Sequence, residues 1–119
     1  MKSFNYYSAK DSKEASKLSS SNSVYLAGGM TTIPSMKLGL ASYKDIIDIK
    51  NIKKLSGIKI SAKSVIIGAT TKHVEVAKSK EVKKAIHSLS SLAEGIGDPQ
   101  VRNRGTIGGS IANNDPSAD

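Results

Sequence analysis

The chain has 119 residues, a formal net charge of +8, 38% hydrophobic residues, two histidines and no cysteine. Without cysteine it offers no disulfide, no thiolate metal ligand and no ligand set for an iron–sulfur cluster, and we expect no metal site. No stretch approaches the roughly 18 apolar residues of a transmembrane helix, and no apolar leader follows Met1. We therefore expect a soluble, cytoplasmic chain of domain size that does not enter a membrane.

The positive charge has two interpretations. Sixteen of the eighteen basic residues are lysines, scattered along the chain without a block of like charges. Nucleic-acid binders that read sequence favour arginine and stacking aromatic residues, and this chain has only Arg102, Arg104, one Phe and four Tyr. Solvated lysines on exposed faces are the favoured interpretation, with no nucleic-acid partner, and a basic nucleic-acid surface is the alternative.

In chain order, the first part of the sequence alternates short strands with short helices. Asp11 and Glu14 have the spacing of a capping box, and Pro34 suits the first turn of a helix that follows Thr31 and Thr32. The pattern predicts a strand at 4–7, a helix at 11–19, a strand at 24–27, a helix that carries Met36 and Leu40, and a strand at 45–49.

The second part begins with a predicted hairpin, whose arms are residues 57–61 and 64–69. Thr70 or Thr71 is expected to cap the next helix. The helical spacing of apolar residues from Val82 to Ala93 then predicts one longer helix over 81–95. Residues 96–119 are rich in Gly, Asn, Asp and Pro without a helical or strand period, so we expect a functional loop there.

A first glycine loop follows the predicted strand at 24–27 and precedes a helix. Gly28 and Gly29 allow backbone N–H groups to approach an anion closely, and the hydroxyls of Thr31 and Thr32 add donors. The loop is therefore a candidate pyrophosphate cradle. It matches neither the GxGxxG fingerprint nor a Walker A loop, and a strand terminator without a ligand is the alternative.

A second glycine loop runs from Arg104 to Ser110 and again combines two glycines with hydroxyl residues. Gly108 lies 80 residues after Gly28. The two loops therefore act on one phosphate-bearing ligand only if the fold brings them together.

Three stretches of the sequence resemble one family. They are Ala27-Gly28-Gly29 through Leu38, Ile67 through His73, and Ile96 through Asn113 with Asp115-Pro116 and Ala118-Asp119. In these the chain is similar to the FAD-binding medium subunit of the molybdenum hydroxylases, of the carbon monoxide dehydrogenase and xanthine dehydrogenase type. The resemblance spans essentially the whole chain.

The resemblance implies an α/β (α+β) fold in which FAD lies, non-covalently bound, between two lobes. The first lobe is expected at about 1–55 and the start of the second at about 56–119. The backbone N–H groups of both glycine pairs, with the hydroxyls of Thr31, Thr106 and Ser110, would contact the phosphates, and no residue is given a catalytic role. The FAD-contacting positions are expected at Ala27, Gly28, Gly29, Met30, Thr31, Thr32, Thr106, Ile107, Gly108, Gly109, Ser110 and Asp119.

The resemblance also implies a role and partners. Electrons would pass from a molybdenum-cofactor large subunit, through a 2Fe-2S small subunit, to this FAD and then to an external acceptor. The family's subunit is more than twice as long, so its C-terminal remainder is expected to be missing and its unpaired strand edges to favour oligomerisation. The alternative is a remnant that folds without binding FAD, or a structural or interaction piece.

Other residues of the matching stretches have two interpretations each. His73 is expected to pack or cap at a helix start rather than to act in chemistry. Arg102 and Arg104 either bind an anion or partner, or tie their loop to backbone carbonyls and Asp98. Asn113 and Asn114 are expected to form a turn that tolerates left-handed backbone.

Overall fold

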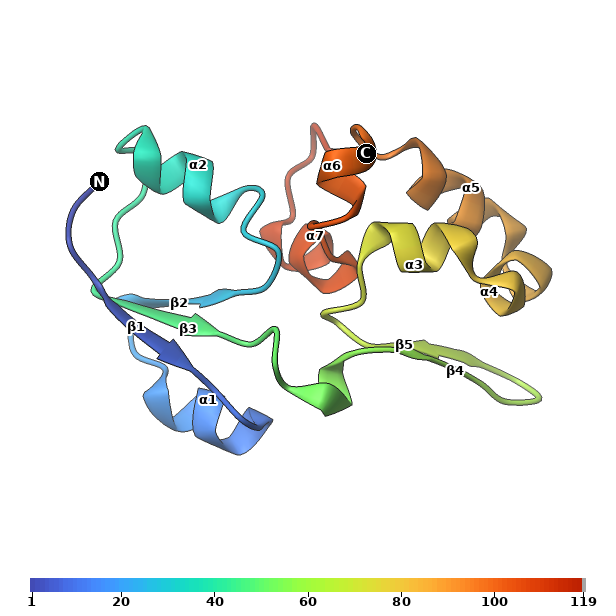
Figure 1. Cartoon of the computed structure of the whole chain (residues 1–119), viewed down its shortest axis with the longest axis horizontal. Coiled ribbons are helices and arrows are strands. Elements are labelled where there is room, and N and C mark those ends of the chain that lie inside the picture. The colour runs from blue at the N-terminus through green and yellow to red at the C-terminus, as the bar shows by residue number, and fades with distance from the viewer. Residues whose placement is uncertain (119) are drawn as a thin grey trace.

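Two small β-sheets, each with its own helices, organise the chain (Figure 1). The computed structural model describes residues 1–118 and measures 44 × 30 × 22 Å. We name residues 5–55 the first lobe and residues 56–113 the second lobe. In chain order the elements are β1 (Asn5–Ser8), α1 (Ser12–Leu18), β2 (Ser23–Leu26), α2 (Thr32–Lys37), β3 (Asp45–Asp48), the short 3-10 helix η1 (Lys53–Leu55), β4 (Ile58–Ile60), β5 (Val65–Ile67), α3 (His73–Lys78), α4 (Lys80–Ala85), α5 (His87–Gly95), α6 (Pro99–Arg102) and α7 (Ile107–Asn113).

The sheet of the first lobe is parallel, with strand order β1-β3-β2. Helices α1 and α2 lie on opposite faces of this sheet (Figure 1). The register places Ser8, Asp48 and Leu26 side by side at the carboxyl ends of the strands. Ligands of open α/β sheets bind outside this edge, and the first glycine loop leaves from it. The expected α/β class is confirmed.

A small apolar core lies between this sheet and α1. Ile47 of the central strand has no exposed surface and packs with Ala9, Ala15 and Ile52. The carboxylate of Asp11 accepts a hydrogen bond from the backbone N–H of Glu14 at 2.8 Å, as the capping pattern predicted. That cap sets the start of α1 and turns Ala15 toward the sheet.

Helix α2 is shorter than predicted. Met36 is buried as expected, but the helix ends at Lys37 and Leu40 is 77% exposed. Gly39 has a φ of +74°, and the N–H of Leu40 turns back to the carbonyl of Ser35 at 2.9 Å. The left-handed glycine ends the helix before Leu40, so the prediction that the helix carries this residue was wrong.

The second lobe contains the predicted antiparallel hairpin, formed by β4 and β5, and its register pairs Ile58 with Ile67. Helices α3, α4 and α5 lie together on one side of this hairpin (Figure 1). The buried residues Val76, Val82 and Ala93 form a second apolar core, separate from the first. Against it pack Ile58, Val65, Ile67, Ala77 and Leu89.

The predicted helix over 81–95 is two helices. The helical conformation is interrupted at Ile86, where φ is −140° and ψ is 78°, so that α4 ends and α5 begins there. In one straight helix Val82 and Ala93 would lie about 16 Å apart along the axis. The break brings both into the core with Val76, and Ser90 then donates its hydroxyl to the carbonyl of Ala77 at 2.9 Å. Burial on a shared core therefore overrides the continuous apolar period.

Residues 96–119 also depart from the prediction, because two short helices form within them. Asp98 caps α6 by accepting from the N–H of Val101 at 2.8 Å, and Pro99 occupies its first turn. Helix α7 contains Gly108 and Gly109, which intrinsically disfavour helix. Bonds to the rest of the lobe, described below, hold it in place.

The segment between β3 and β4 joins the lobes. Ile52 is 2% exposed in the first core, while the carbonyl of Leu55 accepts from both the N–H and the hydroxyl of Thr70, at 2.8 and 2.9 Å. The hydroxyl of Thr71 bonds to the backbone of Gly57. The hydroxyls of both threonines therefore bond to this segment. The prediction that Thr70 or Thr71 caps α3 was wrong, because α3 begins at His73 and its N-cap residue is Lys72.

No helix within residues 1–118 is long and apolar enough to cross a membrane.

We predict that Ile47→Ala lowers the free energy of unfolding by about 2–5 kcal/mol, because it opens a cavity at the centre of the first core. The control Leu40→Ala removes a similar volume from an exposed side chain and should change stability by less than about 0.5 kcal/mol. Urea denaturation followed by circular dichroism measures both. Equal losses in the two variants would contradict the assignment of this core.

Candidate functional site

The two glycine loops meet between the lobes. Gly28 packs directly on the backbone of Arg104 and Gly105, and a Cβ built on Gly28 would overlap the Arg104 carbonyl oxygen and lie 3.0 Å from the Cα of Gly105. Only glycine leaves room for this approach. The fold therefore meets the condition that the sequence left open, since loops 80 residues apart lie in contact.

The first loop leaves its backbone donors available. In the described part of the chain, no acceptor is hydrogen-bonded to the N–H groups of residues 28–32. Gly29 has a φ of +76°, and a Cβ there would lie 2.6 Å from Cδ1 of Ile33, so this position also requires glycine. Unpaired N–H groups on a glycine turn form the kind of concavity that binds phosphate oxygens.

The second loop is held firmly by its own lobe. The N–H of Ile107 donates to the carbonyl of Thr71 at 3.0 Å and that of Gly108 to the carbonyl of Ala69 at 2.9 Å. The N–H of Gly109 donates to Oγ1 of Thr106 at 3.1 Å. In this structure the N–H groups of Gly108 and Gly109 thus both have acceptors within the protein, and their contact with a phosphate stays a prediction.

The same bonds explain the glycine at position 108. A Cβ built there would lie 2.5 Å from the carbonyl oxygen of Ala69 and 2.6 Å from its Cβ. Gly108 is thus required by close packing of α7 on the chain that precedes α3. Ser110 follows on α7 as an exposed residue, and its hydroxyl contacts the ring of His73.

His73 supports the second loop from behind. Its N–H donates to the carbonyl of Gly105 at 3.0 Å, and its Nε2 lies 3.2 Å from Oγ of Ser110. The side chain is buried, and this burial lowers the pKa of His73 below 6.5. These contacts agree with the packing role expected at a helix start.

Arg102 and Asn114 serve the conformation of the segment around the second loop. Arg102 donates from Nη1 to the carbonyls of Ile96 and Gly97, at 2.9 and 3.0 Å, which agrees with the tie to backbone carbonyls. Asp98 is used as the cap of α6 instead. Asn114 ends α7 with a φ of 49°, in the left-handed conformation expected of it. The predicted FAD contact at Asp119 lies outside the described residues.

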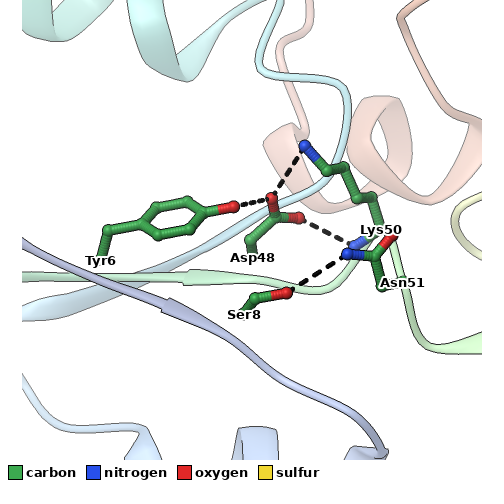
Figure 2. Close-up of polar contacts among 5 residues, drawn as sticks. All are labelled: Tyr6, Ser8, Asp48, Lys50 and Asn51. Atoms are coloured by element: carbon green, nitrogen blue, oxygen red, sulfur yellow. Dashed lines mark hydrogen bonds and ion pairs between the residues drawn. The ribbon is translucent and has the colours of Figure 1, made fainter.

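A buried carboxylate that no sequence motif indicated lies at the carboxyl edge of the first sheet. Asp48 is 1% exposed, and Figure 2 shows the side chains of Tyr6 and Lys50 directed at it. The hydroxyl of Tyr6 donates to Oδ2, where Nζ of Lys50 also lies at 3.2 Å, and the N–H of Lys50 donates to Oδ1 at 2.9 Å. The available signal was an acidic residue at the end of an apolar strand, which usually faces solvent.

Comparison with known proteins identifies the family. Residues 2–119 match the family model described as "FAD binding domain in molybdopterin dehydrogenase". The chain belongs to this family. FAD is accordingly the cofactor of the family, and the observed α/β fold is that of its members.

Individual relatives agree with this assignment. The carbon monoxide dehydrogenase medium chain of Hydrogenophaga pseudoflava is 41% identical and the glyceraldehyde dehydrogenase medium chain of Sulfolobus acidocaldarius 39% identical; each match covers 98% of this chain. A solved carbon monoxide dehydrogenase from H. pseudoflava superposes with a TM-score of 0.95 at 42% identity, over 98% of this chain and 42% of that one. The chain spans 42% of the length of both curated relatives as well.

We predict that the stability of the fold falls as the pH is lowered from neutrality through 6.5. The pKa of folded His73 is below that of the unfolded residue, so the unfolded state binds more protons in this range and acid favours unfolding. His73→Gln should flatten that part of the profile, whereas His87→Gln, at an exposed position, should leave it as in wild type. Thermal melts between pH 4.5 and 7.5 test this, and equal slopes in wild type and His73→Gln would refute it.

Tyr6 is expected to make the stability of the fold depend on pH in the alkaline range. The hydrogen bond to Asp48 raises the pKa of Tyr6 above 10.0. The folded state therefore retains the phenolic proton more firmly than the unfolded state, and the stabilisation present below pH 10 is lost as the pH rises through the folded pKa. Tyr6→Phe should remove that component, so that the stability difference between wild type and variant narrows above pH 10. A constant difference from pH 8 to 11 would contradict the bond.

Proposed function

We propose that this chain binds FAD non-covalently between its two lobes, with the diphosphate against the first glycine loop, as an electron-transfer module of a molybdenum hydroxylase-type oxidoreductase. The observation that carries the proposal is the contact of Gly28 with Arg104 and Gly105, which joins the two loops at one place. The family match supports FAD as the ligand. The two lobes would then form one FAD-binding domain.

The donors of the two loops fit such a ligand in different ways. The unpaired N–H groups of residues 28–32 supply backbone donors for a diphosphate, and the hydroxyls of Thr31 and Thr32 stand beside them. On the second loop, the hydroxyl of the buried Thr106 accepts from the N–H of Gly109, and Oγ of Ser110 lies 3.2 Å from Nε2 of His73. The contacts of both hydroxyls with FAD stay predictions. Ala27, Met30 and Ile107 border these donors in the chain, and their contacts with FAD stay predictions.

Bound FAD supplies the redox chemistry, and the protein binds and orients it. Without cysteine the chain provides no ligands for an iron–sulfur cluster, so electrons must arrive from another chain or domain. We propose a molybdenum-cofactor large subunit and a 2Fe-2S small subunit as partners, which the medium-chain names of the relatives support. Co-purification with both subunits, and reduction of FAD in the assembled complex, test this role.

The cytoplasmic location and the homo-oligomer suggested by the sequence stay predictions. Titration of the 119-residue chain with FAD, followed by the flavin absorbance and fluorescence, and with ADP as a competitor, tests the proposed ligand directly. Saturable binding of both supports the proposal. A cooperatively melting chain that binds neither would instead favour the alternative of a folded piece without FAD.

We predict that Gly28→Ala weakens FAD binding at least about tenfold, because the added Cβ forces the first loop away from Arg104 and Gly105. Gly95→Ala is the matched control, since a Cβ at Gly95 meets no atom within 4 Å. FAD titration of both variants, with melting curves to confirm folding, gives the comparison. Equal affinity of wild type and Gly28→Ala would show that the junction of the loops is not the binding site.

A further inference from the structure

The buried Asp48 lies where the chain leaves the first lobe for the second. The inter-lobe connection, residues 49–57, begins directly after it and leads to β4. Asp48 makes two interactions with Lys50, the second residue of the connection (Figure 2). The backbone N–H of Lys50 donates to Oδ1 at 2.9 Å, and its Nζ forms an ion pair with Oδ2 at 3.2 Å. Tyr6 from the neighbouring strand β1 donates its hydroxyl to the same carboxylate.

These contacts define the direction in which the connection starts. An apolar side chain at position 48 would fill the space but leave the Lys50 N–H without this acceptor. Both carboxylate oxygens are used, and at 1% exposure water competes little for them. Asn51 adds a bond from Nδ2 to Oγ of Ser8 at 3.3 Å (Figure 2). The start of the connection is therefore attached to both Asp48 and the end of β1.

Both ends of the connection are tied to the glycine loops. At its start, the N–H of Ile49 donates to the carbonyl of Leu26 at 2.9 Å, directly before the first loop. At its end, Gly57 bonds to the hydroxyl of Thr71, whose carbonyl accepts from Ile107 in the second loop at 3.0 Å. A short path of bonds thus runs from Asp48 through the connection to each loop.

We propose that Asp48 is a positioning residue of the cofactor site. By binding Lys50 and Tyr6 it fixes the inter-lobe connection, and the connection in turn fixes the position of one glycine loop relative to the other. This inference rests on the proposed binding of FAD between the lobes. Within residues 1–118 the side chain of Asp48 makes its hydrogen bonds and ion pair with Tyr6 and Lys50 and with neither loop, so its effect would pass through the backbone of residues 49–57. The first lobe can stay folded without the Asp48 contacts, because its core lies around Ile47 on the opposite face of the sheet.

The lack of native cysteines allows a direct measurement of lobe geometry. Lys13→Cys on α1 and Lys84→Cys on α4 place one spin label on an exposed helical position of each lobe. Pulsed electron paramagnetic resonance then gives the distribution of distances between the labels. We expect a narrow distribution in the otherwise wild-type chain and a clearly broader one after Asp48→Ala, and a smaller broadening after Asp48→Asn, whose amide oxygen still accepts from Lys50.

Ligand affinity forms the second arm of the test. At a temperature where the melting curves show every variant folded, Asp48→Ala should weaken ADP and FAD binding about tenfold or more, and Tyr6→Phe to a lesser extent. Asp45→Asn is the matched control, because Asp45 is a carboxylate at the other end of β3 that bonds to Asn5 at 2.9 Å. It should change neither the distance distribution nor the affinity.

The outcomes separate this inference from the proposed function. If the wild-type chain binds neither FAD nor ADP, the proposed function is wrong and the positioning role falls with it. If wild type binds, and Asp48→Ala changes neither the label distances nor the affinity, only the positioning role is overturned. Broader distances with unchanged affinity overturn it too, and if Asp48→Ala fails to fold, Asp48→Asn and Tyr6→Phe decide by the same two measurements.

Discussion

The fold depends on one place where two backbones touch without a side chain between them. At Gly28 the end of a parallel sheet meets Arg104 and Gly105, which belong to a lobe with a separate core. Neither core extends across this contact, so the lobes meet through main chain and through the segment that joins β3 to β4. A site built in this way depends on backbone geometry more than on the chemistry of particular side chains.

Local signals predicted much of the structure, because they are set by neighbouring residues. Asp11 caps α1 as its spacing with Glu14 indicated, and the hairpin pairs Ile58 with Ile67. The failures share a different cause. The break at Ile86 and the helix through Gly108 follow from contacts with distant residues, namely Val76 for the former and Ala69 for the latter. A single sequence does not display such contacts, and propensity alone argues against both outcomes.

The same distinction applies to the candidate site. The glycines were found because a close approach of backbone demands that residue type, and their number in two short loops is conspicuous. The sequence did not show that the backbone N–H groups are unpaired in the first loop and hydrogen-bonded in the second. That difference depends on Thr71 and Ala69, whose carbonyls accept from α7. Asp48 was missed for a related reason, because only the neighbouring strand shows that Tyr6 stands beside it. Burial and pairing across strands are properties of the fold.

The hydrogen bonds from the N–H groups of Ile107 and Gly108 to Thr71 and Ala69 bear on how the proposed site would bind a ligand. The second loop is held in place without a ligand, since the N–H groups of Ile107, Gly108 and Gly109 have acceptors within the protein and His73 contacts Ser110. The first loop has backbone N–H groups without an acceptor and leads into the short helix α2. A ligand would therefore take its backbone hydrogen bonds from the few residues after β2. Affinity in such a site would depend on the backbone geometry of that one turn, while the second loop keeps the conformation that its own lobe imposes.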